Sequence, residues 1–520
     1  WKDKEGSFME KEKNLVLDVD ESPKKVSEWF AFAIQHILAM LVACITVPKI
    51  TGLPIAATII SAGLGTLCYL CFTKFKSPVF LSSSFAYLAP MGSALTVGLT
   101  GGVVGMNYLA VIIGMAMVGL VYVIVAIVIK FVGTQWINKL LPPIIVGPVI
   151  MVIGLSLAGS AVSNLTSSVG SSYNLLALLC GLIAMFATAL ASHYGKGKFI
   201  SLIPFIIGMG AGYVSAVLIT LIGYYGFHSS YCNIVDFTAF VKIFGKGNFT
   251  LASIFNYNLF VPNHEESFIF LHTTEIKAFD WKSLGAIALL FVPVALVTVC
   301  EHIGDHENLG NIINKDLLNE EPGMARTLSG DGVATAISGA LCGAANTTYG
   351  ENVAVVGATK IASVKVIMLA AILSILFGFF TPFTAFLTTI PTCVTGGVSL
   401  ILYGFIASSG VKMLIQEKID FNKMKNIFIA SVILVTGIGG LALKFGNPSS
   451  PVIQITSIAV SMILGIILNL VLVEKEEEKV EPKEKAEKPV EAKPAEKAES
   501  VNKETQLSKS TKKPAATKTT

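Results

Sequence analysis

Long apolar runs recur through most of this chain, and they constrain the fold more than any other feature. Each run is about 20 residues, which is enough for a helix to cross the hydrocarbon core of a bilayer. Roughly fourteen such runs lie between Trp29 and Val473. They begin near residues 29, 54, 78, 103, 142, 174, 199, 283, 327, 349, 365, 388, 425 and 452. The sequence therefore predicts an all-α polytopic membrane protein.

The composition supports this prediction. Apolar residues make up 53% of the chain and charged residues only 14%, which is far from the balance of a soluble domain. The charged segment 1–28 leads into a full-length apolar run rather than a short one, so we expect a cytoplasmic N-terminal segment and no cleavable signal peptide.

Lysine and arginine residues in the short loops predict the orientation, because such residues are retained on the cytoplasmic side. Short loops after even-numbered spans carry nearly all of them, whereas short loops after odd-numbered spans carry only Lys49 and Lys444. We expect a multi-pass protein of the plasma membrane with both termini in the cytoplasm. The long segment 223–280 is expected outside the cell.

The two ends of the chain differ from its middle. Residues 474–520 are rich in Lys, Glu, Pro and Ala, so we expect a disordered cytoplasmic tail that cannot bury a core.

The eight cysteines are scattered and only Cys232 falls in the predicted outer segment. We therefore expect no disulfide framework and no cysteine-based metal site.

Short internal matches indicate a repeat. An offset of 266 residues relates Gln35-His36-Ile37 to Glu301-His302-Ile303, and it also relates Ser84-Phe85 to Gly350-Glu351. A similar offset of 249 residues relates Pro142, Gly147 and Val149 to Pro391, Gly396 and Val398. Halves with an odd number of spans must run in opposite directions. The sequence thus predicts a seven-plus-seven inverted repeat, in which the site lies near the midplane at interrupted helices.

Two predicted spans are interrupted by polar residues. The stretches SPVFLSSSFAYLAP (77–90) and NTTYGENVAV (346–355) bear Ser, Thr, Asn and Gly where a continuous helix was expected. We expect partly extended backbone there, which is tolerated at membrane depth only against protein or a water-filled cavity. The second stretch carries Glu351 and Asn352.

A second polar cluster, CEHIGDHENLG, ends the eighth predicted span. Glu301 and Asp305 are four residues apart and share a helix face, and His302 and His306 share a neighbouring face. Ionisable residues within spans typically mark substrate or proton paths. We interpret Glu301 and Glu351 in this way. For the two histidines we favour an ordinary packing role, because the end of this helix approaches water near Asn308.

The sequence resembles the nucleobase–ascorbate transporter family over nearly the whole stretch from Trp29 to Val473. The residues that carry the resemblance are QHILAM (35–40), LSSSFAYLAP (81–90), EHIGDH (301–306), SGDGVATAISG (329–339), NTTYGEN (346–352) and GGVSLILYG (396–404). The family signature requires a Gly where this chain has Ala354. Bacterial members of the uracil branch usually have a His where this chain has Asp305.

The resemblance implies a transporter domain over residues 29–473, divided into a core and a gate. The core would comprise about 29–130 and 283–381, and the gate about 140–222 and 388–473. Paired short strands in spans three and ten would bring the substrate site together between them. Members of the family also lead us to expect proton-coupled uptake through Glu301 and Asp305, and a homodimer.

The resemblance also implies roles for individual residues. Glu301 and Glu351 would accept hydrogen bonds from the substrate's ring N–H groups, and the backbone N–H groups of Phe85, Gly350 and Glu351 would donate to its carbonyls. The remaining residues would line or support the pocket: Ala43, the Phe85 ring, Tyr349 and Tyr403 as lining, and Gln35, His36 and Asn352 as support. No cofactor and no nucleic-acid partner are expected.

The chemistry of the residues agrees with a nucleobase. A pyrimidine dione is a flat ring whose edge alternates N–H donors with C=O acceptors, so acceptor carboxylates beside free backbone N–H groups complement it. Hydrogen bonds to a charged carboxylate are strong. The resemblance implies the uptake of uracil, and this complementarity agrees with it.

Three alternatives stay open at the level of sequence. A purine permease of the same family, for xanthine or uric acid, would use the same types of residue. An anion transporter or channel with the same architecture is disfavoured by two buried acidic side chains. A membrane metalloenzyme could use His302 and His306 with a nearby carboxylate, but the pattern is not HExxH and lacks an obvious third ligand.

Overall fold

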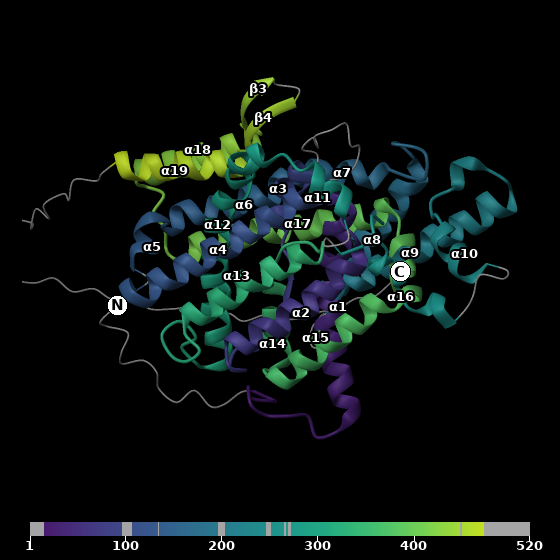
Figure 1. Ribbon diagram of the computed structural model, residues 1–520, viewed down its shortest axis with the longest axis horizontal. Helices are drawn as coiled ribbons and strands as arrows, with labels where there is room; N and C mark the ends of the chain where they lie inside the picture. The colour runs from purple at the N-terminus through teal and green to yellow at the C-terminus, as the bar shows by residue number, and fades with distance from the viewer. Residues whose placement is uncertain are drawn as a thin grey trace, which may run out of the picture. The chain divides into compact units, whose positions relative to one another are not determined.

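The computed structural model describes residues 15–95, 107–133, 135–195, 203–245, 251–264, 267–268, 272–447 and 450–472. These residues are mostly helical (Figure 1). Eight helices are long and apolar enough to cross a membrane: Val26–Thr51, Ile55–Phe72, Tyr108–Val132, Pro143–Thr166, Leu175–Tyr194, Pro204–Gly226, Trp281–Ile313 and Thr392–Gln416. The chain is therefore an integral membrane protein.

The helices follow the apolar runs closely. Those of the first half are α1 (Val26–Thr51), α2 (Ile55–Phe72), α3 (Leu88–Leu95), α4 (Tyr108–Val132), α5 (Gln135–Leu140), α6 (Pro143–Ser156), α7 (Ala158–Thr166), α8 (Leu175–Tyr194) and α9 (Pro204–Ile219). The predicted outer segment contains the short helices α10 (Thr238–Phe244) and α11 (Thr273–Ala278). Those of the second half are α12 (Leu284–Ile313), α13 (Met324–Ala340), α14 (Gly350–Thr359), α15 (Val364–Phe379), α16 (Thr381–Thr389), α17 (Thr392–Gln416), α18 (Met424–Ile438) and α19 (Ser457–Val471).

Helix packing divides these elements into two groups. Helix α2 packs on α13 and α15, α4 packs on α12 and α13, and α1 packs on α15. In the other group, α17 packs on α6, α7 and α8, α8 packs on α9, and α18 packs on α6 and α19. The short helix α14 packs on α1 and α12 of the first group. The site residues predicted from the sequence lie on this group, on α14 or next to the two short strands described below, except Tyr403 on α17.

Close helix contacts within both groups depend on glycine. A Cβ atom at Gly119 of α4 would lie 2.6 Å from the Gly332 carbonyl oxygen of α13. In the second group, a Cβ atom at Gly147 of α6 would lie 3.1 Å from the Gly410 carbonyl oxygen of α17. Small residues allow helix backbones to approach in this way where lipid provides no hydrophobic drive for association.

Two short strands interrupt the helices where extended backbone was predicted. Strand β1 (Leu81–Ser83) pairs antiparallel with β2 (Asn346–Thr348), with Leu81 opposite Thr348 and Ser83 opposite Asn346. The Ser84 N–H continues the ladder by donating to the Ala345 carbonyl at 2.8 Å. The prediction of strands in segments three and ten is confirmed.

Other predictions of the fold are only partly answered. Four of the remaining apolar helices are shorter than a full span: Phe85–Leu95, Val364–Phe379, Met424–Ile438 and Ser457–Val471. The number of fourteen spans and the inverted repeat therefore stay predictions. The predicted starts near 103 and 199 lie outside the described residues, as does the tail 474–520.

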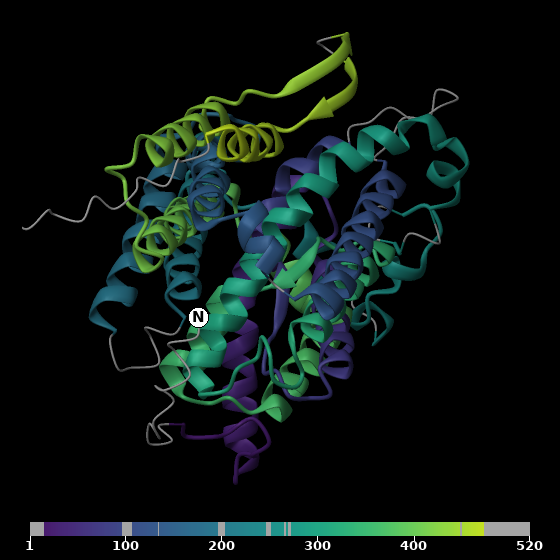
Figure 2. The same cartoon turned by 90° about the vertical axis from the view of Figure 1, so that its left-hand side faces the viewer.

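The sequence reasoning missed a hairpin near the C-terminal end of the membrane domain. Strand β3 (Leu443–Asn447) pairs antiparallel with β4 (Ser450–Ile455), and the last helix begins at Ser457 rather than near residue 452. Figure 2 shows this hairpin, coloured yellow-green, extending away from the helices. The apolar residues of β4 are the ones that predict the start of the last span near residue 452.

Candidate functional site

Helix α12 carries two pairs of ionisable residues on neighbouring faces. Glu301 and Asp305 form one pair, and both side chains are partly exposed. His302 and His306 form the other, and both are fully buried at 0% exposure. The helical spacing of four residues predicted this division, and the structure shows that the two faces have different surroundings.

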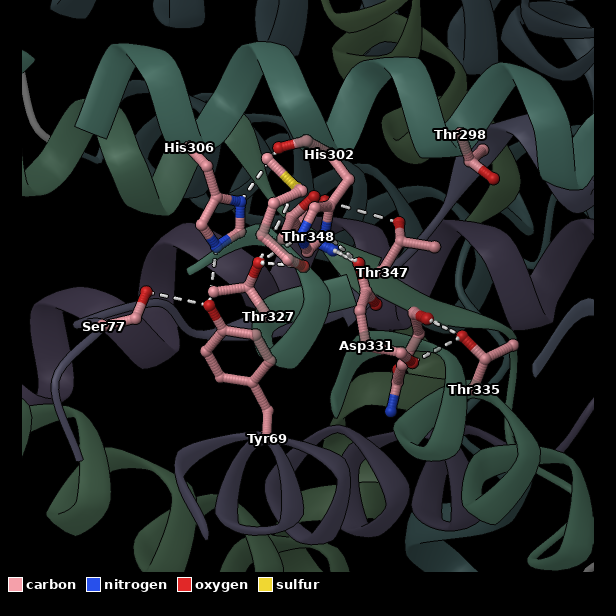
Figure 3. Close-up of polar contacts among 12 residues, drawn as sticks. Tyr69, Ser77, Thr298, His302, His306, Thr327, Asp331, Thr335, Thr347 and Thr348 are labelled. Atoms are coloured by element: carbon pink, nitrogen blue, oxygen red, sulfur yellow. Dashed lines mark hydrogen bonds and ion pairs between the residues drawn. The ribbon is translucent and has the colours of Figure 1, made fainter. Parts of the chain in front are cut away.

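The histidine face is a closed hydrogen-bond network (Figure 3). His306 Nδ1 lies 2.9 Å from the His302 carbonyl oxygen and Nε2 lies 2.6 Å from the Tyr69 hydroxyl, which lies 2.8 Å from Ser77 Oγ. With Nδ1–H donating to the carbonyl, Nε2 accepts from Tyr69, and Tyr69 accepts from Ser77. The two imidazole rings stack at 4.0 Å between centroids. Every polar atom of His306 thus has a partner within the protein.

His302 joins α12 to α13 through a carboxylate that the sequence reasoning did not single out. His302 Nδ1 lies 2.6 Å from Asp331 Oδ2, and Nε2 lies 3.1 Å from Thr327 Oγ1. Asp331 is fully buried, and its Oδ2 also accepts from the Thr348 N–H of β2 at 3.3 Å. The signal was present, since an Asp within a predicted span is a functional candidate by the same rule that selected Glu301.

The acidic face of α12 lies beside the start of α14. A Cβ atom at Gly350 would lie 3.3 Å from Asp305 Oδ1. Glu301, Asp305, Asp331 and Glu351 are all close enough to interact electrostatically. Within the described residues, neither Glu301 nor Glu351 has a hydrogen bond or ion pair to another side chain, and Asp305 Oδ2 is buried without a partner. Glu301 and the Asp305 Oδ2 atom are therefore left to accept hydrogen bonds, while the Glu351 carboxylate accepts from its own backbone N–H.

Backbone donors lie next to these acceptors. Helix α14 begins at Gly350 directly after β2, and a 3₁₀-turn (Phe85–Tyr87) follows β1. The first N–H groups of a helix have no partner within it, and together with the helix dipole they favour polar acceptors. The β1–β2 pairing brings these two helix starts together. Acceptors and donors are thus gathered in one small region.

Helix α1 supports the start of α14. His36 Nδ1 lies 2.9 Å from Asn352 Oδ1, and both side chains are buried. Gln35, at 8% exposure, and Ala43, at 0%, lie on the same helix. The structure therefore places the three predicted supporting residues on α1 and α14, although only His36 and Asn352 are joined by a hydrogen bond.

Aromatic side chains border the region. The Phe85 ring meets the Tyr403 ring edge to face, with centroids 5.7 Å apart and planes at 76°. This contact joins the β1 segment to α17 of the second packing group. Tyr349 precedes α14 and is 6% exposed, and the Tyr403 hydroxyl is buried without a partner among the described residues. The structure brings the predicted lining residues into the region, and their roles stay predictions.

A metal role for the two histidines finds no support in this geometry. Both ring nitrogens of each imidazole have hydrogen-bond partners within the protein. In the part of the chain that the structure describes, no group of three or more His, Cys, Asp or Glu residues could hold a metal ion. The rings join helices instead.

Comparison with known proteins gives a consistent result. The model of a permease family matches residues 27–445. Uracil permease from Bacillus caldolyticus is 41% identical over 457 residues, which are 88% of this chain and 94% of that protein. Uracil permease from Bacillus subtilis (strain 168) is 35% identical and covers 91% of this chain and 98% of that protein. Such relatives indicate a transporter and not an enzyme.

Solved structures agree on the fold. The transmembrane domain of the cyanobacterial bicarbonate transporter BicA matches with a TM-score of 0.55 at 10% identity, covering 87% of this chain and 99% of that one. Murine solute carrier 26 family member A9 matches with a TM-score of 0.55 at 10% identity, covering 87% of this chain and 69% of that one. At this identity the similarity concerns the fold alone.

Proposed function

The chain belongs to the permease family whose model matches its residues 27–445, and from this premise we propose that it takes up uracil across the plasma membrane by proton-coupled alternating access. Relatives named uracil permeases, at 32–41% identity over most of the chain, support the substrate. One observation carries the proposal at the level of chemistry: Glu351, whose carboxylate has no side-chain partner among the described residues, stands in the first turn of α14 beside the acidic face of α12.

The proposed binding mode uses donors and acceptors in alternation. Glu301 and Glu351 accept from the ring N–H groups of uracil, and the N–H groups of Phe85, Gly350 and Glu351 donate to its carbonyls. His36 fixes Asn352 and so the first turn of α14. A site that pairs such groups rejects analogues that leave them unpaired. Ala43, Tyr349, the Phe85 ring and Tyr403 enclose the ring faces.

The two packing groups suggest how transport proceeds. The group of α1, α2, α4, α12, α13 and α15, with the strands and α14, would be the core, and the group of α6 to α9 and α17 to α19 would be the gate. Substrate bound beside the contact of Phe85 with Tyr403 would touch both groups. Movement of the core against the gate would then expose the site alternately to each side of the membrane.

Proton coupling is proposed from the carboxylate cluster. Ionisable groups that interact strongly titrate as a coupled set. A proton taken up by Glu301 or Asp305 therefore changes the net charge of the carboxylate cluster beside the substrate. With both termini in the cytoplasm, the cytoplasmic end of α12 would carry this cluster. A homodimer remains part of the proposal.

Uptake by cells or proteoliposomes tests the proposed function. Labelled uracil should accumulate, and unlabelled uracil should compete for it better than xanthine or uric acid does. A protonophore should abolish accumulation, while removal of Na⁺ should leave it unchanged. Competition in favour of xanthine would assign a purine permease, and Na⁺-dependent, protonophore-resistant uptake would overturn the proton coupling.

A further inference from the structure

The N-terminal residues 15–23, here called the clasp, are bound to the segment that follows α14. The Val16 N–H donates to the Lys360 carbonyl at 2.8 Å, and the Leu17 N–H approaches the same oxygen at 3.3 Å. In return, the Ala362 N–H donates to the Leu17 carbonyl at 2.9 Å and the Val364 N–H to the Val19 carbonyl at 3.0 Å. Leu17 and Ile361 form a parallel bridge.

Side chains anchor the clasp as well. Val19 is 1% exposed and belongs to the main apolar core. The Ser363 hydroxyl donates to the Glu21 carbonyl at 2.6 Å, and the Trp29 indole N–H donates to the Pro23 carbonyl at 2.8 Å. Residues 361–363 are themselves buried beneath it. The clasp, which is part of the predicted cytoplasmic N-terminal segment 1–28, is thus folded onto the transporter domain.

The clasp touches the cytoplasmic ends of the three helices that carry the candidate site. It leads directly into α1, which bears His36, and it covers the end of α14, which bears Glu351. Lys315, just after α12, lies 3.8 Å from Asp18. This ion pair is partly exposed and contributes little by itself. It nevertheless connects the end of α12 to the clasp, which also contacts the ends of α1 and α14.

Helix α14 needs support at this end. It has only ten residues, and helices shorter than about 12–15 residues are marginal without tertiary contacts. Its start is held by β2 and by the His36–Asn352 hydrogen bond. At its other end Lys360 turns into the left-handed region at φ 60°. The Lys360 carbonyl there accepts from the clasp.

We propose that the clasp positions α14, and through it Glu351, so that residues 15–23 set the affinity of the substrate site about one helix length away. The clasp residues do not touch the substrate. They hold the end of α14 against α1 and α12, so that the Glu351 carboxylate is presented beside Glu301. The affinity part of this inference rests on the proposed function, whereas the positioning part does not.

Matched substitutions at Val16 isolate the central hydrogen bond. The Val16 side chain is 66% exposed, so Val16→Ala keeps the N–H that binds Lys360 and changes little else. Val16→Pro removes that N–H. In the full chain without substrate, we expect hydrogen exchange in residues 350–359 to be faster in Val16→Pro than in Val16→Ala. Equal protection of these residues in both variants would overturn the positioning role.

Substrate affinity supplies the second measurement. We expect Val16→Pro to raise the Kd for uracil about five- to tenfold, the effect of losing about one hydrogen bond, and Val16→Ala to leave it unchanged. In a Glu351→Gln background the Val16→Pro effect should disappear, because the clasp acts through that carboxylate. A lower Tm with an unchanged Kd would reduce the clasp to a stabilising contact and contradict the inference.

Two further outcomes are distinguishable. If the wild-type chain bound no uracil, the proposed function would fail, while the exchange measurement would still decide whether the clasp positions α14. If Val16→Pro yielded no folded protein, Val19→Ala would be compared with Val16→Ala in the same two measurements. Val19 is buried and Val16 is exposed. The comparison therefore separates the loss of a buried anchor of the clasp from a mere change of its surface.

Discussion

The two faces of α12 carry the same spacing of ionisable residues but differ in what completes their hydrogen bonding. His302 and His306 are fully buried, and each of their ring nitrogens has a protein partner. Glu301 and Asp305 are partly exposed, and they lie beside the start of α14 with oxygens left to accept. From this difference we infer that the histidines of α12 hold the fold together, whereas its two carboxylates are left for the proposed substrate and proton.

The strongest test of the structural face is Asp331→Ala. This change removes the partner of His302 Nδ1 and the acceptor of the Thr348 N–H, and breaking a buried pair typically costs about 3–5 kcal/mol. We expect a large fall in Tm or little folded protein, measured by fluorescence-detected size exclusion after heating. Asp331→Asn, which keeps an acceptor oxygen, should be milder. Wild-type stability in Asp331→Ala would show that the pair is not structural.

The carboxylate on α14 that lies beside the acidic face of α12 should respond in the opposite way. Glu351→Gln keeps an acceptor oxygen but loses the charge, so we expect uracil binding to weaken by about 1.5–3 kcal/mol, or roughly 10- to 150-fold in Kd. Tm should stay close to wild type because the carboxylate has no side-chain partner among the described residues. Glu417→Gln, at an exposed position after α17, is the matched control. Wild-type affinity in folded Glu351→Gln would remove Glu351 from the site.

The sequence was sufficient for much of this comparison. Apolar runs predicted the helices, polar interruptions predicted β1 and β2, and charges within spans selected Glu301, Asp305 and Glu351. All of these are properties of single segments. Whether His302 is structural depends on which helix faces it, and the partner Asp331 lies 29 positions away on α13. The spacing of the histidines along α12 does not predict that contact.

Two further features escaped prediction for the same reason. The lysines and arginines of the short loops predict that residues 1–28 are cytoplasmic, but they do not predict that the clasp pairs with residues 360–364, more than 340 positions later in the chain. The β3–β4 hairpin has apolar residues that resemble the start of a span, and only strand pairing separates the two. Local pattern therefore identified elements, and long-range pairing decided what they do.

A smaller effect is expected from Asp305→His, which places on the acidic face the residue usual in the uracil branch of the family. A protonated imidazole repels a proton arriving at a neighbouring carboxylate. We therefore expect the variant to fold and bind, with the pH optimum of uptake moved to lower values. Initial uptake rates across pH measure this, and an unchanged profile would show that Asp305 is not coupled to the group that carries the proton.

The smallest effect is expected at an ion pair outside the membrane, which completes the contrast with His302 and Asp331. Lys74 and Lys76 lie 2.5 and 2.6 Å from the Glu321 oxygens, with side chains about half exposed. Their hydrogen bonds lower the pKa of Glu321 to about 2. A depressed pKa contributes stability above the unfolded value of about 4.3, and this contribution is lost as the pH falls toward 2. Between pH 5 and 8 it is constant.

Because exposed pairs contribute little and salt screens them, Glu321→Gln should leave Tm at pH 7 within experimental error, and added NaCl should shift wild type and variant alike. The distances in this ion pair are as short as the 2.6 Å between His302 and Asp331, so geometry alone would rank the two as equal. A Tm loss for Glu321→Gln as large as that for Asp331→Ala would show that burial is not what separates them, and the contrast between paired and unpaired groups would need another cause.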